Sequence, residues 1–163
     1  MKGRNIMPEL ICNELSRGTT ATQETGKHTI LVYSPDIELC MSVHMMFEPQ
    51  YRVLTTTDIG MLGEMASSHQ PDMLVVDAPP SYVILRQLEA IKRAQPSMAI
   101  IALTPARSSD WVLFNVYFPT IDTICSKQFT ETELRHVVDR LFENAREKRK
   151  SENTEIRSAR SIS

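Results

Sequence analysis

The chain has 163 residues, of which 42% are hydrophobic and 23% are charged, with a formal net charge of −2. This composition is typical of one globular domain with a real core, and it does not fit a strongly basic nucleic-acid-binding surface. No apolar run approaches the roughly 20 residues that span a bilayer, and none follows the basic N-terminus to form a signal peptide. Three widely spaced cysteines fit neither a disulfide framework nor a zinc site, so we expect a cytoplasmic location.

The glycine and histidine residues exclude most catalytic motifs that have a local signature. All five glycines lie in the first 63 residues, and their spacings do not match a P-loop, a dinucleotide fingerprint or a nucleophile elbow. The four histidines form no HExxH pattern and do not pair with cysteine. We therefore expect that the chain is not an enzyme.

The first part of the chain predicts an arm, a strand and a helix. Residues 1–27 are mixed and polar, which indicates a flexible N-terminal arm. The sequence HTILVY at 28–33 predicts the first strand. Apolar residues then recur at helical spacing as far as residue 47, and Ser34 before Pro35 is suited to cap this helix.

The middle of the chain repeats this alternation of short apolar strands and amphipathic helices. Turn residues separate the segments, and Asp58 is placed to cap the second helix. The expected elements are a strand at 51–56, a helix at 58–69, a buried strand at 72–76, a helix at 82–94 and a buried strand at 98–103.

The segment 109–118, SDWVLFNVYF, predicts a helix although it contains many β-forming residues. Its aromatic residues are Trp111, Phe114, Tyr117 and Phe118. Packing of one helix side against the strands explains any one of them, but all four cannot point inward at helical spacing. An exposed apolar patch is therefore our hypothesis for this region.

The last part of the chain predicts a strand at 120–125 and a long amphipathic helix. Thr130 and Glu133 have the spacing of a capping box, and an apolar stripe follows as far as Ala145. Residues 147–163 have almost no apolar content and mix basic with acidic side chains. We expect a disordered, solvated polar tail there.

Strands that alternate with helices predict an α/β fold with a doubly wound, five-stranded parallel sheet and helices on both faces. The default order for five strands is the flavodoxin-like 2-1-3-4-5, whose ligand crevice lies beyond the ends of strands 1 and 3. This domain is expected over residues 28–146. Asp77, directly after the third strand, therefore lies at the expected crevice.

Other polar residues also follow the expected strands. Ser34 and Asp36 follow the first strand, Thr104 follows the fourth, and Lys127 follows the fifth. Because the carboxyl ends of parallel strands share one edge, we expect carboxylate, hydroxyl and ammonium groups to meet at one rim.

The segments ILVYSPD, PDMLVVDAPP, IIALT and SKQF, in this order and spacing, resemble the receiver domain of bacterial two-component response regulators over about residues 28–145. The resemblance implies that Asp77 accepts a phosphoryl group from a histidine kinase. It also implies that the Thr104 hydroxyl contacts this group as a switch and that Lys127 neutralises its charge. Phosphoryl transfer to an anionic nucleophile needs such cations and donors.

The sequence departs from the receiver pattern at the end of the first strand, where receivers normally carry two acidic residues that hold magnesium. An ungapped reading places Ser34 and Pro35 there, and neither supplies a charged ligand. Mg²⁺ held by Asp77, with Asp36 as a weak further ligand, is therefore expected to bind weakly. An acid at a helix N-terminus is the better explanation of Asp36. We interpret the chain as a degenerate receiver.

Several functions remain open. The leading hypothesis is a receiver-like signalling module of a bacterial phosphorelay, phosphorylated on Asp77 and acting through protein–protein contacts. The alternatives are a phosphorylation-independent pseudo-receiver, in which Asp77 is structural, and a flavodoxin-like small-molecule binder, which the segment YSPDIE disfavours. The expected partners are a sensor histidine kinase or phosphotransfer protein, and a downstream protein or a second copy of the chain. Neither nucleic acid nor a membrane is expected.

Overall fold

The computed structural model describes residues 27–105 and 120–160. A five-stranded parallel sheet in the order β2-β1-β3-β4-β5 forms its centre, which confirms the predicted fold class and strand order. The strands are β1 (Thr29–Tyr33), β2 (Arg52–Thr56), β3 (Met73–Asp77), β4 (Ala99–Thr104) and β5 (Thr123–Ser126). The helices are α1 (Ile37–Phe47), α2 (Ile59–His69), α3 (Tyr82–Ala94) and α5 (Glu131–Arg160).

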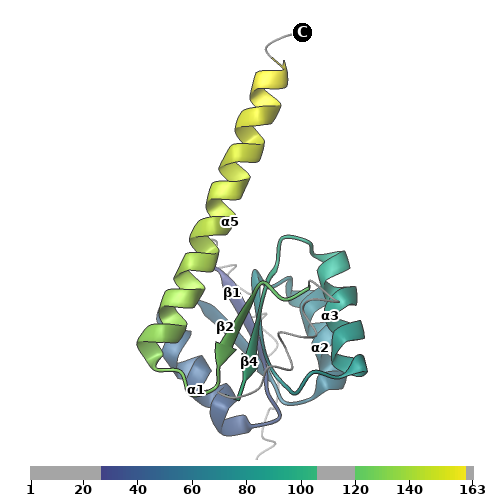
Figure 1. Cartoon of the computed structure of the whole chain (residues 1–163), viewed down its shortest axis with the longest axis vertical. Helices are drawn as coiled ribbons and strands as arrows, with labels where there is room; N and C mark the ends of the chain where they lie inside the picture. The colour runs from purple at the N-terminus through teal and green to yellow at the C-terminus, as the bar shows by residue number, and fades with distance from the viewer. Residues whose placement is uncertain (1–26, 106–119, 161–163) are drawn as a thin grey trace, which may run out of the picture.

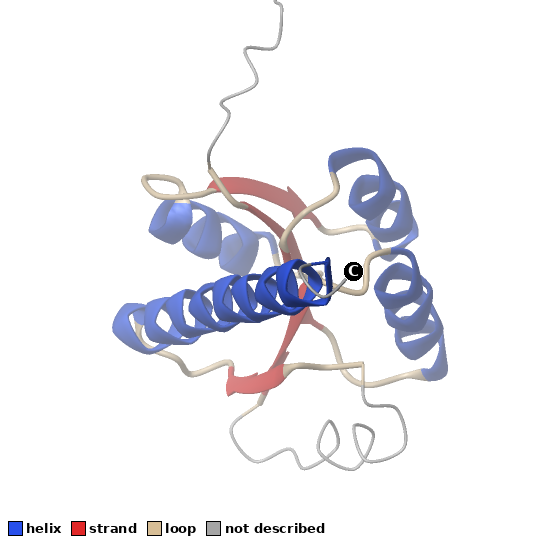
Figure 2. Cartoon of the chain, turned by 90° about the horizontal axis from the view of Figure 1, so that it is seen from above, coloured by secondary structure: helices blue, strands red, loops and turns tan. Residues whose placement is uncertain are grey.

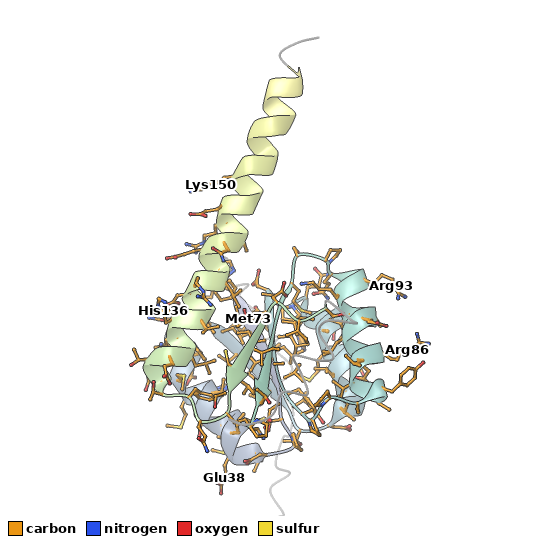
Figure 3. All side chains as sticks on the ribbon, in the orientation of Figure 1. Glu38, Met73, Arg86, Arg93, His136 and Lys150 are labelled. Carbon is orange, nitrogen blue, oxygen red and sulfur yellow. The ribbon has the colours of Figure 1, made fainter. Side chains whose placement is uncertain are left out.

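Helices cover both faces of the sheet (Figure 2). One apolar core lies between the sheet and the pair α1 and α5, and the other lies between the sheet and the pair α2 and α3. Every residue of β1 and β3 is buried, since these central strands have a helix layer on each side. Met73 lies in the middle of this packed structure (Figure 3).

The first helix begins later than we predicted, because its N-cap is Asp36 and not Ser34. The carboxylate of Asp36 accepts a hydrogen bond from Glu38 N at 2.9 Å. Ser34 still belongs to the edge of the sheet, where its N–H donates to Thr56 O at 3.2 Å. The cap predicted for the second helix is confirmed, since Asp58 accepts from Gly60 N at 2.7 Å.

The fifth strand is shorter than the predicted segment 120–125 and begins at Thr123. The side chain of Asp122 explains this late start, because its Oδ2 accepts hydrogen bonds from Ile100 N and from Lys92 Nζ, each at 2.8 Å. At this end of β4 the Asp122 side chain therefore adds to a backbone contact, in which Asp122 N donates to Ile100 O at 2.9 Å.

The last helix continues to Arg160, so our prediction of a disordered tail is wrong for residues 147–160. The predicted capping box is confirmed, since Thr130 N donates to Glu133 Oε2 at 2.7 Å and Glu133 N donates to Thr130 Oγ1 at 3.3 Å. The sequence after the cap contains no glycine or proline and is rich in lysine, arginine and glutamate, which all favour helix. As a result, α5 extends well beyond the sheet (Figure 1).

Three predictions fall wholly or partly outside the described residues: the N-terminal arm, the helix at 109–118 with its aromatic patch, and the last three residues of the tail. No helix within residues 27–105 and 120–160 combines the length and the apolar content needed for a membrane span.

Candidate functional site

Asp77 is the last residue of β3, and its side chain is only 2% exposed at the carboxyl edge of the sheet. A buried carboxylate is costly unless polar partners surround it. Here Oδ1 lies 2.6 Å from Lys127 Nζ, and Oδ2 accepts a hydrogen bond from Ser34 Oγ at 2.7 Å. Both carboxylate oxygens are therefore bonded to neighbouring side chains.

Lys127 follows β5 directly, and its backbone extends the pairing of β5 with β4. Its N–H donates to Thr104 O at 2.7 Å, which continues the pairing of β4 with β5 by one residue. The lysine side chain is 37% exposed, whereas the carboxylate that it contacts is almost fully buried. The ammonium group therefore lies between the solvent and Asp77.

Ser34 is fully buried. We had predicted it to cap the first helix and to lie at the rim that Asp77 shares. Its hydroxyl donates to Asp77 and accepts the N–H of Asp36 at 3.0 Å. The pairing of Tyr33 with Val76 between the neighbouring strands β1 and β3 explains its position, because the next residue of each strand is then Ser34 and Asp77. The strand order predicted from sequence contained this contact, although we did not draw it out.

Thr104, the predicted switch residue, is the last residue of β4 and is 7% exposed. Leu103 pairs with Asp77 across the sheet, so Thr104 lies one residue beyond the level of the carboxylate. Its hydroxyl donates to Pro105 O at 3.3 Å. The structure thus brings Asp77, Lys127 and Ser34 into direct contact and places Thr104 on the adjacent strand end.

The donor groups at this site do not fit Mg²⁺. Asp36 caps α1, as we expected of an acid at a helix N-terminus. The ammonium group of Lys127 already neutralises Asp77. Within the part of the chain that the structure describes, no three His, Cys, Asp or Glu side chains form a group that could hold a metal ion. A single carboxylate with both oxygens engaged is a poor ligand for an ion that requires several oxygen ligands.

The thiol of Cys40 lies beside this site, and it is almost completely buried. Burial raises its pKa, the backbone of Ser34 lowers it, and the charges of Asp36 and Asp77 raise it further, with a net increase above the ordinary value. The thiol is therefore protonated at neutral pH and is not a reactive nucleophile.

Comparison with solved structures identifies the architecture. NtrX from Brucella abortus, in complex with ATP, matches 78% of this chain with a TM-score of 0.68 and 16% identity. A CheY-like response regulator receiver domain protein from Methanospirillum hungatei matches 75% of this chain with a TM-score of 0.67 and 17% identity, over 98% of its own length. This chain has the receiver fold. It spans only 29% of NtrX, and it covers nearly the whole of the Methanospirillum receiver domain.

The receiver fold also occurs in a putative pilus assembly-related protein from Burkholderia pseudomallei. That protein matches 71% of this chain and 90% of its own chain, with a TM-score of 0.61 and 20% identity. No family model matches this sequence, and no curated protein matches it. The fold expected from the receiver resemblance is confirmed, and the phosphoryl chemistry of Asp77 stays a prediction.

Proposed function

We propose that this receiver-fold domain is a signalling module that acts through protein–protein contacts without needing phosphorylation of Asp77. The contact of Asp77 with both Lys127 and Ser34 carries this proposal. The carboxylate is neutralised and hydrogen-bonded within the chain itself, so this edge of the sheet is stable without a metal ion or a phosphoryl group.

The surroundings of Asp77 supply little of the positive charge that phosphoryl transfer requires. Oδ1 contacts Lys127 and Oδ2 accepts from Ser34, and each oxygen keeps a further lone pair that could attack phosphorus. Phosphoryl transfer also needs cations to stabilise the charge that develops on the transferred group. Lys127 supplies one cation, whereas Ser34 brings no charge that would attract a magnesium ion.

An exposed apolar stripe on α1 supports a role in protein contacts. Ile37, Met41 and Met45 recur every four residues along this helix, and each is at least 59% exposed. Three more exposed apolar side chains, Met61, Tyr82 and Val83, lie in the first turns of α2 and α3. Because the helices run antiparallel to the strands, these first turns lie at the same edge of the sheet as Asp77.

The charges beside the stripe define the partner that it fits. Asp36, Glu38 and Glu48 are exposed at the two ends of α1, and Glu38 points outward from its first turn (Figure 3). We infer a partner helix whose apolar face is flanked by lysine or arginine. Methionine side chains adapt to the shape of such a partner more readily than branched ones.

A phosphorylated receiver is the second candidate function. The position of Lys127 at 2.6 Å from Asp77 favours it, because the resemblance assigns these two residues to phosphate neutralisation and phosphoryl acceptance. In this candidate a histidine kinase or phosphotransfer protein supplies the phosphoryl group, and Thr104 contacts it. A cytoplasmic, non-enzymatic protein remains the expectation in both candidates.

Incubation with Mg²⁺ and acetyl phosphate, followed by intact-mass measurement, separates the two candidates. The proposal expects no mass gain. A gain of one phosphoryl group that Asp77→Asn abolishes and Asp72→Asn preserves would establish the second candidate instead.

The contact surface is tested with a synthetic helical peptide that carries leucine at every fourth position and lysine beside it. Amide NMR shifts are expected to map its binding to α1, equally in the wild type and in Asp77→Asn. Met41→Glu with Met45→Glu should abolish binding, whereas Met61→Glu, at a methionine on α2 that is 42% exposed, should retain it. Binding that survives the α1 double substitution would contradict the proposed surface.

A further inference from the structure

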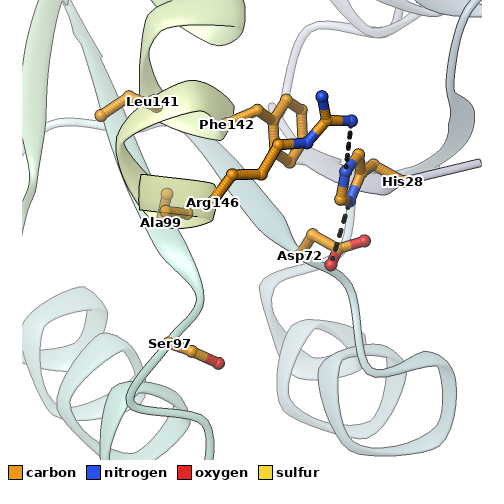
Figure 4. A pocket seen from close by; sticks show the side chains of 8 residues that line it. His28, Asp72, Ser97, Ala99, Leu141, Phe142 and Arg146 are labelled. Carbon is orange, nitrogen blue, oxygen red and sulfur yellow. Dashed lines mark hydrogen bonds and ion pairs between the residues drawn. The ribbon is translucent and has the colours of Figure 1, made fainter. Parts of the chain in front are cut away.

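A second polar cluster lies at the opposite edge of the sheet, where the strands begin (Figure 4). His28 directly precedes β1, and its ring stacks on Phe142 of α5 with the ring centroids 4.4 Å apart. Its Nδ1 lies 3.3 Å from Asp72 Oδ1, and its Nε2 lies 3.4 Å from Arg146 Nη2. Sequence analysis did not reveal this cluster, because its members come from three distant segments.

The partners of His28 suit one tautomer of a neutral ring. A carboxylate only accepts hydrogen bonds, so a hydrogen on Nδ1 can be donated to Asp72. A guanidinium only donates, so Nε2 without a hydrogen can accept from Arg146. Both ring nitrogens have a partner in this tautomer. Asp72 is itself fixed, because its Oδ2 accepts the N–H of Thr29 at 2.8 Å.

Protonation of His28 has opposite effects on the two contacts. The Nδ1 contact with Asp72 gains charge attraction, whereas Nε2 then carries a hydrogen and a share of positive charge directly opposite Arg146. Histidine changes its charge between about pH 5 and 8, so this conflict arises in an accessible range. The further charged groups nearby are Lys27, next to His28 in the chain, and Glu147, next to Arg146.

The phenol of Tyr51, which lies on the other side of Phe142, stays protonated between about pH 5 and 8. Tyr51 stacks on the other side of the Phe142 ring, with the centroids 5.2 Å apart, and its hydroxyl donates to Asp139 at 2.6 Å. Burial, together with the hydrogen bond and the charge of Asp139, raises the pKa of Tyr51 to about 12.

Arg146 lies on α5, so its contact with His28 joins this helix to the start of β1. Phe142, Ala145 and Arg146 line a small cavity of about 20 Å³ beside His28, room for about one water molecule. After Arg146 the helix continues to Arg160, away from the sheet (Figure 1). Arg146 thus lies at the point where α5 leaves the globular part of the domain.

We propose that His28 and Arg146 form a proton-sensitive latch that fastens α5 where it leaves the sheet. Neutral His28 accepts from Arg146 and holds the helix at this point. Protonated His28 stays with Asp72 and releases Arg146, so the first turn of the projecting segment, residues 147–150, becomes less ordered. The latch is independent of the chemistry of Asp77.

Backbone NMR of the full chain at pH 8 and at about pH 5.5 tests the latch within the range where histidine titrates. The order of residues 147–150 is expected to decrease at the lower pH, with a change in the helical population of about twofold to fivefold, the size of one weak surface charge interaction. Absence of a change in these residues would overturn the proposal.

Two substitutions should lock the latch in one state each. His28→Gln keeps a neutral acceptor for Arg146. At either pH, residues 147–150 of this variant should be as ordered as those of the wild type at pH 8. Arg146→Met removes the donor, so at either pH these residues should be as poorly ordered as those of the wild type at about pH 5.5. His136→Gln is the control, because His136 is exposed on the same helix and points away from the sheet (Figure 3). It should keep the pH response.

If the pH response persists in His28→Gln, another group causes it and the latch is wrong. Thermal unfolding of each variant verifies that the domain is folded under both conditions. A variant that is unfolded is replaced by His28→Asn or Arg146→Gln, which test the same loss of charge with smaller changes in shape.

Discussion

Ser34 donates its hydroxyl hydrogen to Oδ2 of Asp77 across 2.7 Å, and the pairing of β1 with β3 holds the two residues side by side. An uncharged donor thus occupies a position from which a second carboxylate would reach the same space. Lys127 already neutralises Asp77, so the pair adds little net charge to the crevice. Whether the crevice is negatively charged therefore depends on the residue at position 34.

Ser34→Asp should raise the affinity of the crevice for Mg²⁺ above that of the wild type. A second carboxylate beside Asp77 supplies the hard oxygen ligands that this ion prefers, and we expect binding at least about tenfold tighter than in the wild type. Amide NMR shifts during a Mg²⁺ titration measure the change. Ser34→Ala, which removes the hydrogen bond without adding charge, should show no gain. Equal binding in all three proteins would contradict the role assigned to Ser34.

Lys127→Met should destabilise the domain, because it leaves the buried carboxylate of Asp77 without its cation. Buried pairs lose several kcal/mol when one partner is removed, and the partial exposure of Lys127 reduces this to about 1–3 kcal/mol. Urea unfolding gives the free energy. Addition of Asp77→Asn to Lys127→Met should recover part of the loss, since the buried group is then neutral. Purely additive losses would show that the two side chains do not interact.

Glu133 should contribute to acid sensitivity through the cap of α5. The hydrogen bonds from Thr130 N and from the Thr130 hydroxyl lower the pKa of Glu133 below its ordinary 4.5. A lowered pKa in the folded state means that the stabilisation is present above pH 4.5 and is lost as the pH falls through the folded value. Unfolding in urea at a series of pH values should therefore show a smaller acid-dependent loss in Glu133→Gln than in the wild type. Identical slopes would be inconsistent with the cap.

Tyr51→Phe should remove an alkaline component of stability while it keeps the aromatic stack on Phe142. The folded-state pKa of about 12 exceeds the ordinary value of 10.0, so the contribution is complete below pH 10 and is lost between pH 10 and 12. At neutral pH the lost hydrogen bond to Asp139 should cost about 0.5–1 kcal/mol. Absorbance titration of both proteins isolates the Tyr51 phenol, and a phenol that titrates fully near pH 10 would refute its contact with Asp139.

Gln70→Gly should stabilise the domain. Gln70 ends α2 with φ of 45°, a left-handed conformation that costs a non-glycine residue about 1 kcal/mol, so a gain of up to this amount is expected. Glu48→Gly is the matched control, because Glu48 ends α1 with φ of −49° and should lose stability on the same substitution. Thermal unfolding compares the two, and a loss in both would exclude strain at Gln70.

The hydrophobic pattern predicted the fold well, because strands buried on both faces appear as uninterrupted apolar runs. Residues 73–76 are an example, and the polar residue that ends this run marked the crevice correctly. Strand order predicted that Asp77 and Lys127 lie at one rim, and the receiver resemblance implied that they act together. The hydroxyl bond of Ser34 was missed because serine before proline also suits a helix cap, and only the three-dimensional register of β1 decides between the two.

Two further features could not be read from the sequence for physical reasons. Helix after residue 146 has no apolar stripe to reveal it, since intrinsic propensity and not burial favours it. The cluster around His28 joins side chains that are as many as 118 residues apart, and no local pattern records such a contact. For the His28 cluster, the missing information lies in the packing between distant segments.

The stacking of His28 on Phe142 has a consequence for synthesis on the ribosome. Among the described elements the central strand β1 is made first, but one of its two covering layers depends on α5, which is made after all the other described elements. Until Phe142 has left the exit tunnel, the nascent chain exposes apolar side chains such as Val32 and Phe47 that the folded domain buries completely. The core on this face of the sheet therefore closes only after the ribosome has passed α5.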